Sequence, residues 1–375
     1  MAYKDLQAFI KDLDKRGELK RIAPETDSYL EITEIADRTV KAGGPALLFE
    51  KVKGSPYPVF INGMGTMERM ALALGVKDLD EIGDRIARLL DMSEYAGLMD
   101  KVRALPRLAP LLAVFPRPAV TAPCQQVVEE PDLGKLPVLH CWPGDGGRFF
   151  TLPLVITRDP DTGMQNMGMY RMQVFSENTT GMHWHLHKDG RALFEKYRSR
   201  GEKMPVAVAL GCDPATIYAA TAPLPAMIDE FLFAGFLRKS PVETVKCLNS
   251  DIRVPAHAEF ILEGYVDPSE PLREEGPFGD HTGYYSLTDL YPVFHVEKIT
   301  RKKKPVFPAT IVGQPPMEDC FLAKATERIF LPLIRMLFPE IVDYNFPLEG
   351  VFHNCVIVSI RKRYPGQARK VMNFL

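Results

Sequence analysis

The chain has 375 residues, of which 46% are hydrophobic and 25% are charged, and this composition is typical of globular proteins. Its formal net charge of −2 gives no indication of a nucleic-acid partner, and no apolar run approaches the about 18 residues of a membrane span. A chain of this length is expected to form two or three domains, and six cysteines without a CxxC pair indicate reduced thiols in the cytoplasm.

The N-terminal part alternates between helical and strand patterns. Apolar residues recur at helical spacing over 6–13 and 32–40, and short apolar runs at 46–52 and 57–63 are typical of buried strands. Two more helical patterns follow before a proline-rich segment at 107–124. This alternation predicts an α/β unit that ends within the proline-rich segment.

Short strands dominate the next part of the chain. Two helices are expected among them, near 191–198 and 227–237. The expected strands are 149–159, 165–177, 180–187, 204–211, 242–248, 258–266 and 291–299. This pattern predicts a barrel or a sandwich, and an α/β pattern returns after about residue 308, with a helix over 318–338 and a strand over 351–363.

The stretch QNMGMYR places Asn166 and Arg171 five residues apart. Residues an odd number apart point to opposite faces of a regular strand, so these two share a site only where the strand is distorted. A bulge at Gly168 would supply that distortion.

The stretch MHWHLH places His183, His185 and His187 at alternating positions, on one face of an expected strand. Three interpretations remain open. The histidines bind zinc together, they form a polar face of the sheet, or one of them joins oxygen ligands around manganese or magnesium.

The stretch EEGPFGDHTGYY places Glu275 and Asp280 around a Gly-Pro-Phe-Gly turn. Glycine and proline constrain the backbone there, and Phe278 adds an apolar side chain. A rigid, partly apolar loop can raise the pKa of a carboxyl group and make it a general acid. The alternative is a solvated surface turn with charged flanks.

EGPFGDHTGYY and QNMGMYR, together with EITEIADRTVKAGGPALLFE, resemble the UbiD-type decarboxylases. The resemblance implies an α+β multidomain fold. Its expected parts are an N-terminal α/β domain over 1–115, a central split β-barrel like that of flavin reductases over 116–307, and a truncated C-terminal α/β segment over 308–375. The family continues beyond the point where this chain stops, so a truncated form or a fragment is expected.

The resemblance also implies the activity, which is non-oxidative decarboxylation of an aromatic acid. The expected substrate is 3-polyprenyl-4-hydroxybenzoate, converted to 2-polyprenylphenol in ubiquinone biosynthesis. The alternatives are another aromatic or α,β-unsaturated acid, in either the decarboxylating or the carboxylating direction, and a non-catalytic form that only binds flavin.

Site residues are carried over from the family by position. The metal ligands fall on Asn166, His187 and Glu230, where Glu230 is preferred to Glu243 because it precedes the FAGFLR stretch. The contacts to prenylated FMN fall on Met169, Tyr170, Arg171, His183, Trp184, His185, Lys188 and Asp189. The acid–base residues are Arg171, Glu275 and Asp280, with Asp280 delivering a proton to the carbon that loses CO2. His183 is a departure, because close relatives have an arginine there.

The expected cofactors are prenylated FMN, manganese or magnesium, and a potassium ion. The expected partners are a small aromatic acid, a flavin prenyltransferase that supplies the cofactor and, for a full-length form, further copies of the chain, with no nucleic acid. The expected location is the cytoplasm, with peripheral contact to the inner membrane through a prenylated substrate.

Overall fold

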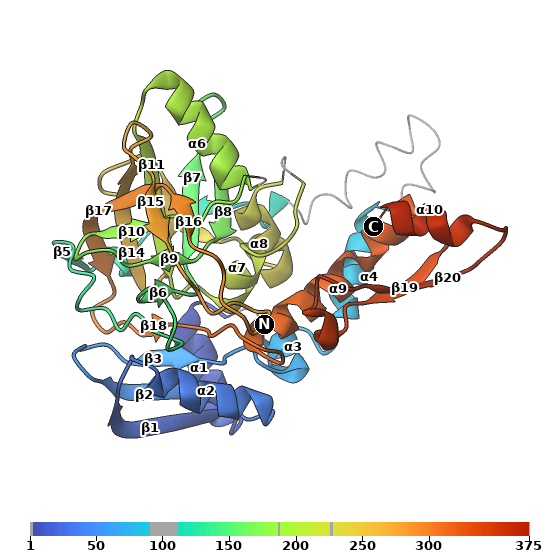
Figure 1. The fold of residues 1–375 in the computed structure, drawn as a ribbon, viewed down its shortest axis with the longest axis horizontal. Helices are drawn as coiled ribbons and strands as arrows, with labels where there is room; N and C mark the ends of the chain where they lie inside the picture. Colours follow the sequence, from blue (N-terminus) through green and yellow to red (C-terminus); the bar gives the residue numbers. More distant parts are fainter. Residues whose placement is uncertain (1–2, 91–111, 187, 226–227, 375) are drawn as a thin grey trace.

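The computed structural model describes residues 3–90, 112–186, 188–225 and 228–374. It has an α+β architecture in three parts, which Figure 1 shows in blue, in green to orange, and in red. We call them the N-terminal unit (3–90), the central unit (112–301) and the C-terminal unit (317–374).

The N-terminal unit packs helices against a small mixed sheet. Its elements are α1 (Leu6–Lys15), β1 (Leu19–Thr26), α2 (Glu31–Lys41), β2 (Ala46–Val52), β3 (Val59–Ile61), α3 (Met67–Ala73) and α4 (Asp80–Leu90). The Asp5 side chain caps α1 by accepting a hydrogen bond from the Ala8 backbone N–H. The strand order is β1-β2-β3-β18, and β18 (Phe307–Pro308) runs parallel to β3. A strand distant in the sequence therefore completes this sheet.

The central unit is built around a sheet of seven strands in the order β10-β17-β14-β11-β7-β8, with β5 also paired to β17. Its helices are η1 (Pro123–Gln125), α6 (Asp189–Arg200), α7 (Pro214–Ala219) and α8 (Glu230–Arg238). Its strands are β4 (Arg117–Pro118), β5 (Val127–Glu129), β6 (Phe149–Phe150), β7 (Leu154–Arg158), β8 (Gln165–Met169), β9 (Met172–Gln173), β10 (Thr179–Gly181), β11 (Met204–Leu210), β12 (Glu243–Lys246), β13 (Arg253–Pro255), β14 (Phe260–Val266), β15 (Arg273–Glu275), β16 (Asp289–Tyr291) and β17 (Val293–Arg301).

The two end strands of this sheet, β8 and β10, are not paired with each other in the described part of the chain, so no closed barrel is formed there. The α+β fold class is thus observed, whereas the split barrel stays a prediction. The strand expected over 180–187 ends at Gly181, and the consecutive residues Met182, His183 and Trp184 are all buried. This burial does not alternate, so the chain beyond Gly181 is not a half-buried strand.

The C-terminal unit consists of α9 (Glu318–Leu337), β19 (Ile341–Asn345), η2 (Leu348–Gly350), β20 (Ile357–Ile360) and α10 (Gln367–Phe374). Figure 1 shows this unit projecting from the rest of the molecule, with α9 packed against α4 of the N-terminal unit. The strand expected over 351–363 is shortened to β20, because the preceding residues form a turn in which Val351 and Phe352 have positive φ angles of 53° and 44°. This turn brings His353 next to the central unit.

Within the described ranges, none of the helices combines the length and the apolar composition that crossing a bilayer requires.

Candidate active site

Arg171 connects the other two residues expected to carry the acid–base chemistry, Glu275 and Asp280. Its Nε donates to Glu275 Oε1 over 3.2 Å, its Nη1 to Asp280 Oδ2 over 2.9 Å, and its Nη2 to Ser286 Oγ over 3.3 Å. The pairing of β7 with β8 continues without a shift through Gly168, so the expected bulge is absent. Instead β8 ends at Met169, and the break before β9 turns Arg171 toward the two carboxylates.

Glu275 and Asp280 lie on the hairpin formed by β15, β16 and the loop between them. The loop backbone is fixed from outside, because the Gly279 N–H donates to Asp145 Oδ1 over 2.7 Å and the Gly276 N–H donates to Gln173 Oε1 over 2.7 Å. A side chain at Gly279 would place its Cβ 2.1 Å from Trp142 Cδ1. The loop is therefore rigid and closely packed.

The interpretation of this loop as a solvated turn is wrong for Glu275, which is only 1% exposed. Glu275 Oε1 accepts hydrogen bonds from Arg171 Nε and from His183 Nδ1, the latter over 2.7 Å. Its other oxygen, Oε2, is buried without a partner among the described residues. Glu275 therefore keeps one buried acceptor that no described residue uses.

Asp280 is an ionised carboxylate in this arrangement. Burial alone would raise its pKa, but a hydrogen bond from His281 and the positive charges of His281 and Arg171 outweigh burial and hold the pKa below its usual range. The direction is opposite to the raised pKa that a partly apolar loop suggested. Asp280 must therefore receive a proton before it can act as an acid.

The residues expected to contact the cofactor gather beside this cluster. His183 Nε2 and His185 Nε2 are 3.0 Å apart, and the ring of Tyr291 lies 4.3 Å from that of His183, centroid to centroid. Trp184 is buried and meets the Tyr170 ring edge-on at 6.5 Å. The Trp184 Nε1 donor is buried without a partner among the described residues, so this site has an unused donor as well as an unused acceptor.

The remaining expected contacts lie at the start of α6 and at the end of β8. Lys188 is the N-cap residue of α6, Asp189 is its first residue, and Met169 ends β8. A Cβ at Gly190 would lie 2.6 Å from Trp184 Nε1, so α6 and the histidine-containing segment approach closely. Gly190 at the start of α6 thus packs against Trp184, and Met169 lies two residues before Arg171 in the chain.

Asn166 and Glu230, two of the three expected metal ligands, are in contact. Asn166 Nδ2 donates to Glu230 Oε1 over 3.2 Å, and the Met167 backbone N–H donates to Glu230 Oε2 over 3.0 Å. Both side chains line a cavity of about 270 Å³, and Asn166 Oδ1 is buried without a partner among the described residues. His187, the third expected ligand, lies outside the described residues.

Burial raises the pKa of Glu230 to about 7, against the opposing hydrogen bond from Met167 and with added repulsion from the charges of Asp229 and Asp189. A partly buried carboxylate without a cation, beside a free amide oxygen, is the donor set that a hard divalent ion prefers. The residues present therefore fit a metal of this class.

The rival acid, Glu243, is already satisfied. It accepts hydrogen bonds from His257 and Arg117, each over 2.8 Å, and these partners lower its pKa. This pairing supports the choice of Glu230. The described part of the chain contains no group of three or more His, Cys, Asp or Glu residues that could hold a metal, and the three-histidine zinc site stays a prediction because it includes His187.

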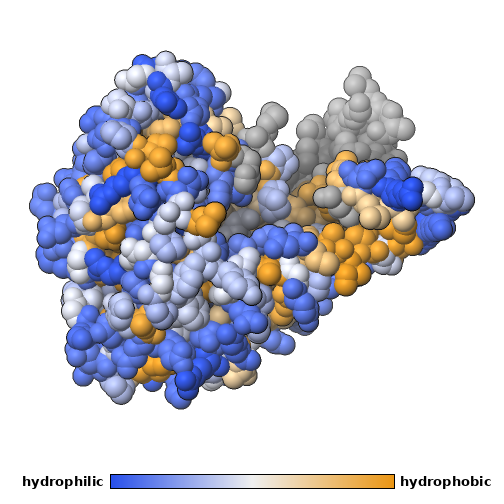
Figure 2. All heavy atoms as spheres, viewed as in Figure 1, coloured by the Kyte–Doolittle hydropathy of each residue, from blue (hydrophilic) through white to orange (hydrophobic). Residues whose placement is uncertain are grey.

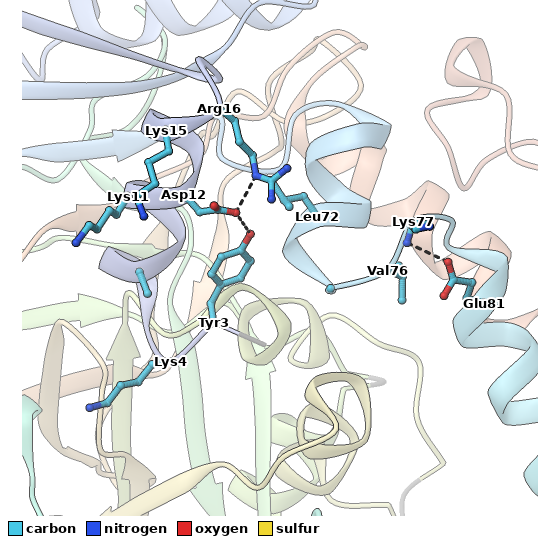
Figure 3. Close-up of a pocket in the computed structure, with 12 residues that line it drawn as sticks. Tyr3, Lys4, Lys11, Asp12, Lys15, Arg16, Leu72, Val76, Lys77 and Glu81 are labelled. Carbon is cyan, nitrogen blue, oxygen red and sulfur yellow. Dashed lines mark hydrogen bonds and ion pairs between the residues drawn. The ribbon is translucent and has the colours of Figure 1, made fainter. Parts of the chain in front are cut away.

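A larger cavity of about 910 Å³ lies between α1 and the segment from α3 to α4, shown in Figure 3. Its acidic residues are occupied: Asp12 accepts from the Tyr3 hydroxyl over 2.6 Å and from Arg16 Nε over 2.9 Å, and Glu81 accepts from the Lys77 backbone. None of the expected site residues lines it. It is therefore separate from the site around Arg171.

Several residues of this site were not identified from the sequence. Ser286, Gln173 and Asp145 fix the loop or Arg171, and His281 bonds Asp280. His281 follows Asp280 directly and was a detectable candidate. Gln173 and Asp145 are distant in sequence from the loop atoms they bond, as Ser286 is from Arg171, and no local pattern marks these three.

Family models match most of the chain. The central model, described as the 3-octaprenyl-4-hydroxybenzoate carboxy-lyase Rift-related domain, matches residues 117–315. The N-terminal and C-terminal domains of the same carboxy-lyase match residues 10–89 and 320–375.

Whole-chain comparisons agree with the family models. Uncharacterized proteins of Archaeoglobus fulgidus and Aquifex aeolicus are 56% and 48% identical, over 99% and 98% of this chain and 77% of each relative. An evolved dimeric form of the UbiD-class enzyme HmfF from Pelotomaculum thermopropionicum, in complex with prFMN, superposes with a TM-score of 0.85 at 28% identity, over 99% of this chain and 82% of that one.

Vanillic acid decarboxylase of Sedimentibacter hydroxybenzoicus in its closed form also superposes with a TM-score of 0.85 at 28% identity, over 100% of this chain and 77% of that one. The three domain models follow one another in this chain in their family order, and the relatives align along nearly all of it. The chain belongs to the UbiD family of carboxy-lyases.

Proposed function

We propose that this chain decarboxylates an aromatic acid, using prenylated FMN and a divalent metal ion. The observation that carries the proposal is the position of Arg171, which binds both Glu275 and Asp280 on a rigid loop. Two histidines and a buried tryptophan lie beside it. This arrangement combines a guanidinium, which binds carboxylates, with a carboxyl group that can handle a proton.

Prenylated FMN, when bound, supplies a conjugated sink for the electron pair that remains when the carbon–carbon bond to CO2 breaks. Met169, Tyr170, Arg171, His183, Trp184, His185, Lys188 and Asp189 would hold it. The unused Trp184 Nε1 donor and the unused Glu275 Oε2 acceptor support this placement.

The chain's own residues then handle the acid and the proton. Arg171 orients the substrate carboxylate and holds Asp280 in reach. Asp280 delivers a proton to the carbon that carried the carboxylate, and the buried Phe278 keeps bulk water from this side of the loop. Glu275 fixes Arg171 and His183 through its Oε1 atom.

Asn166 and Glu230, with His187, would hold manganese or magnesium. The raised pKa of Glu230 supports this assignment, because an adjacent cation would stabilise the ionised carboxylate. A potassium ion is also proposed from the family, without assigned ligands.

The substrate proposed first is 3-polyprenyl-4-hydroxybenzoate, which would place the enzyme in ubiquinone biosynthesis. The family model carries the name of a closely related acid, and the vanillic acid decarboxylase superposes along the whole chain. A different aromatic or α,β-unsaturated acid, and the carboxylating direction, are the alternatives that a substrate panel decides.

Co-expression with a flavin prenyltransferase, which we propose as the cofactor supplier, followed by a CO2-release screen over such a panel, tests this function. In the loaded protein Asp280→Asn should lower turnover by the ~10²–10⁴ typical of a lost general acid while the flavin spectrum is retained. Asp289→Asn is the matched control, because Asp289 is exposed on the same hairpin. Wild-type turnover in loaded Asp280→Asn would remove Asp280 from the mechanism, and a loaded wild type that releases no CO2 would favour the non-catalytic, flavin-binding alternative.

We also propose that the chain forms a homo-oligomer. Figure 2 shows apolar residues gathered on the C-terminal unit, where Met336, Leu337 and Met372 are more than half exposed. Exposed apolar patches of this kind mark interaction surfaces. Light scattering over a range of concentrations tests the proposal, and vesicle flotation with a prenylated acid tests the proposed peripheral membrane contact.

A further inference from the structure

We propose that His281 is the proton carrier that recharges Asp280 in each turnover, and that His353 of the C-terminal unit is the positioning residue that holds His281 in place. The inference rests on the proposed function of Asp280 as the proton donor. It concerns the step after Asp280 has given up its proton.

The contacts of Asp280 lead to His281. Asp280 Oδ2 accepts from Arg171 Nη1 over 2.9 Å, and Oδ1 accepts from His281 Nδ1 over 2.6 Å and from the His281 backbone N–H over 2.8 Å. Both oxygens are thus engaged. A guanidinium does not release its proton in proteins, whereas an imidazolium does so near neutral pH. Of the two side chains that bond the carboxylate, His281 is therefore the proton source.

The other nitrogen of His281 faces the C-terminal unit. His281 Nε2 and His353 Nε2 are 3.0 Å apart, and His353 sits on the turn between η2 and β20. Asp319, the second residue of α9, adds a negative charge that acts on His281, and its Oδ1 is buried without a partner among the described residues. Among the described residues, the charged and titratable groups that act on His281 are Asp280, Arg171, Asp319 and His353.

Their effects assign different roles to the two histidines. The hydrogen bond to Asp280 raises the pKa of His281 against the opposing effect of burial, and Asp319 adds to the rise while Arg171 opposes it. Burial lowers the pKa of His353, and the charge of His281 lowers it further. His281 is thus the cation that donates from both nitrogens, and His353 is the neutral acceptor.

The proton balance of one turnover follows. The carbon–carbon bond to the carboxylate breaks and CO2 leaves, and a carbon–hydrogen bond forms with the proton of Asp280. The His281 Nδ1 proton then moves to Asp280, and His281 takes a proton from water. One solvent proton is consumed per substrate carboxylate. Asp280 also lines a cavity of about 210 Å³, so direct protonation by water is the competing route.

The first test uses the cofactor-free protein and needs no activity. Histidine ring signals are titrated by NMR and assigned with His281→Asn. The pKa of His281 should lie above that of a free histidine and should be lower in Asp280→Asn. It should also be lower in His353→Leu. In His353→Asn, which retains an acceptor, the pKa of His281 should return to the wild-type value. His295→Asn is the matched control, because His295 forms a similar pair with Glu270 at 2.7 Å outside the site.

The second test uses cofactor-loaded protein. His281→Asn keeps a donor near Asp280 but carries no exchangeable proton of suitable pKa, so turnover should fall by about 10²-fold, as for a lost acid–base group. Turnover of the wild type should decline at high pH as His281 loses its proton, and this decline should be absent from His281→Asn. His295→Asn should match the wild type in both respects.

The outcomes separate the two proposals. An unchanged His281 titration in Asp280→Asn, or wild-type turnover with the same alkaline decline in loaded His281→Asn, overturns the inference. In the latter case water protonates Asp280 directly. A loaded wild type that releases no CO2 from any acid overturns the proposed function and the proton-carrying role with it, while the NMR titration still decides whether the Asp280–His281 pair exists.

Discussion

Replacing Glu230 with glutamine should stabilise the metal-free protein at pH 8 and leave its stability nearly unchanged at pH 5. Burial raises the pKa of Glu230 to about 7, so the folded protein binds this proton more tightly than the unfolded chain does. Protonated Glu230 therefore stabilises the fold at low pH, and this stabilisation is lost as the pH rises through the pKa of Glu230 in the folded protein. Glutamine removes the cost of the buried charge and can still accept from the Met167 N–H, while the Asn166 amide turns over to bond it.

The size of the effect follows from the two pKa values. The pKa of Glu230 rises from 4.5 to about 7, and each pH unit corresponds to about 1.4 kcal/mol. The upper limit of the stabilisation at pH 8 is therefore about 3 kcal/mol. Partial solvent exposure of Glu230 makes the measured value smaller.

The assay is the midpoint of thermal unfolding of metal-free wild type, Glu230→Gln and Glu243→Gln between pH 5 and pH 8.5, with and without manganese. Glu243→Gln should behave in the opposite sense, because His257 and Arg117 lower the pKa of Glu243 and its ionised form stabilises the fold above the unfolded value. At pH 8 the unfolding midpoint of Glu243→Gln should therefore lie below that of the wild type. Manganese should raise the midpoint of the wild type and leave that of Glu230→Gln unchanged.

Two results would refute this reasoning. An identical pH dependence in wild type and Glu230→Gln would mean that Glu230 carries no buried charge. Equal stabilisation of both proteins by manganese would place the ion elsewhere.

Three further predictions concern the site around Arg171. Arg171→Met should destabilise the fold by ~3–5 kcal/mol, because it leaves Glu275 buried without the Arg171 cation. Urea unfolding measures the free energy of unfolding, and a loss below about 1 kcal/mol would contradict the prediction. Gly279→Ala should cost ~1–3 kcal/mol and lower turnover, since its Cβ would lie 2.1 Å from Trp142 Cδ1; an unchanged unfolding midpoint would show that the loop yields freely. The chain has two tryptophans, so Trp184 is the only fluorescent tryptophan in Trp142→Phe, and Trp142 is the only one in Trp184→Phe. FMN should quench the fluorescence of Trp142→Phe more strongly than that of Trp184→Phe, and equal quenching would place the flavin elsewhere.

Local patterns predicted the helices better than the sheet. The elements α1, α2 and α9 follow the expected ranges closely, because an amphipathic helix shows its buried face within a few residues. The helix α7 was not expected, since it is short and buried on all sides and so has no polar face. The strand β19 was not expected either, because it is defined by its pairing with β20.

The site was predicted residue by residue through the resemblance, but its electrostatics were not. The sequence contains Arg171 and Asp280 more than a hundred residues apart, and only the fold brings their side chains to 2.9 Å. The lowered pKa of Asp280 depends on that approach and on His281. The sequence shows which residues are acidic or basic, whereas the charge of each group is set by neighbours that are distant along the chain.

The strand β18 makes the N-terminal unit dependent on a segment that is synthesised much later. A fragment that ends at the proline-rich segment would retain α1 to α4 but would leave the edge of β3 open, where other chains can pair with it. Such a fragment should aggregate, although its composition looks like that of an independent domain. On the ribosome, this sheet is completed only after the strands of the central unit have emerged, so its folding is tied to distant contacts that form slowly.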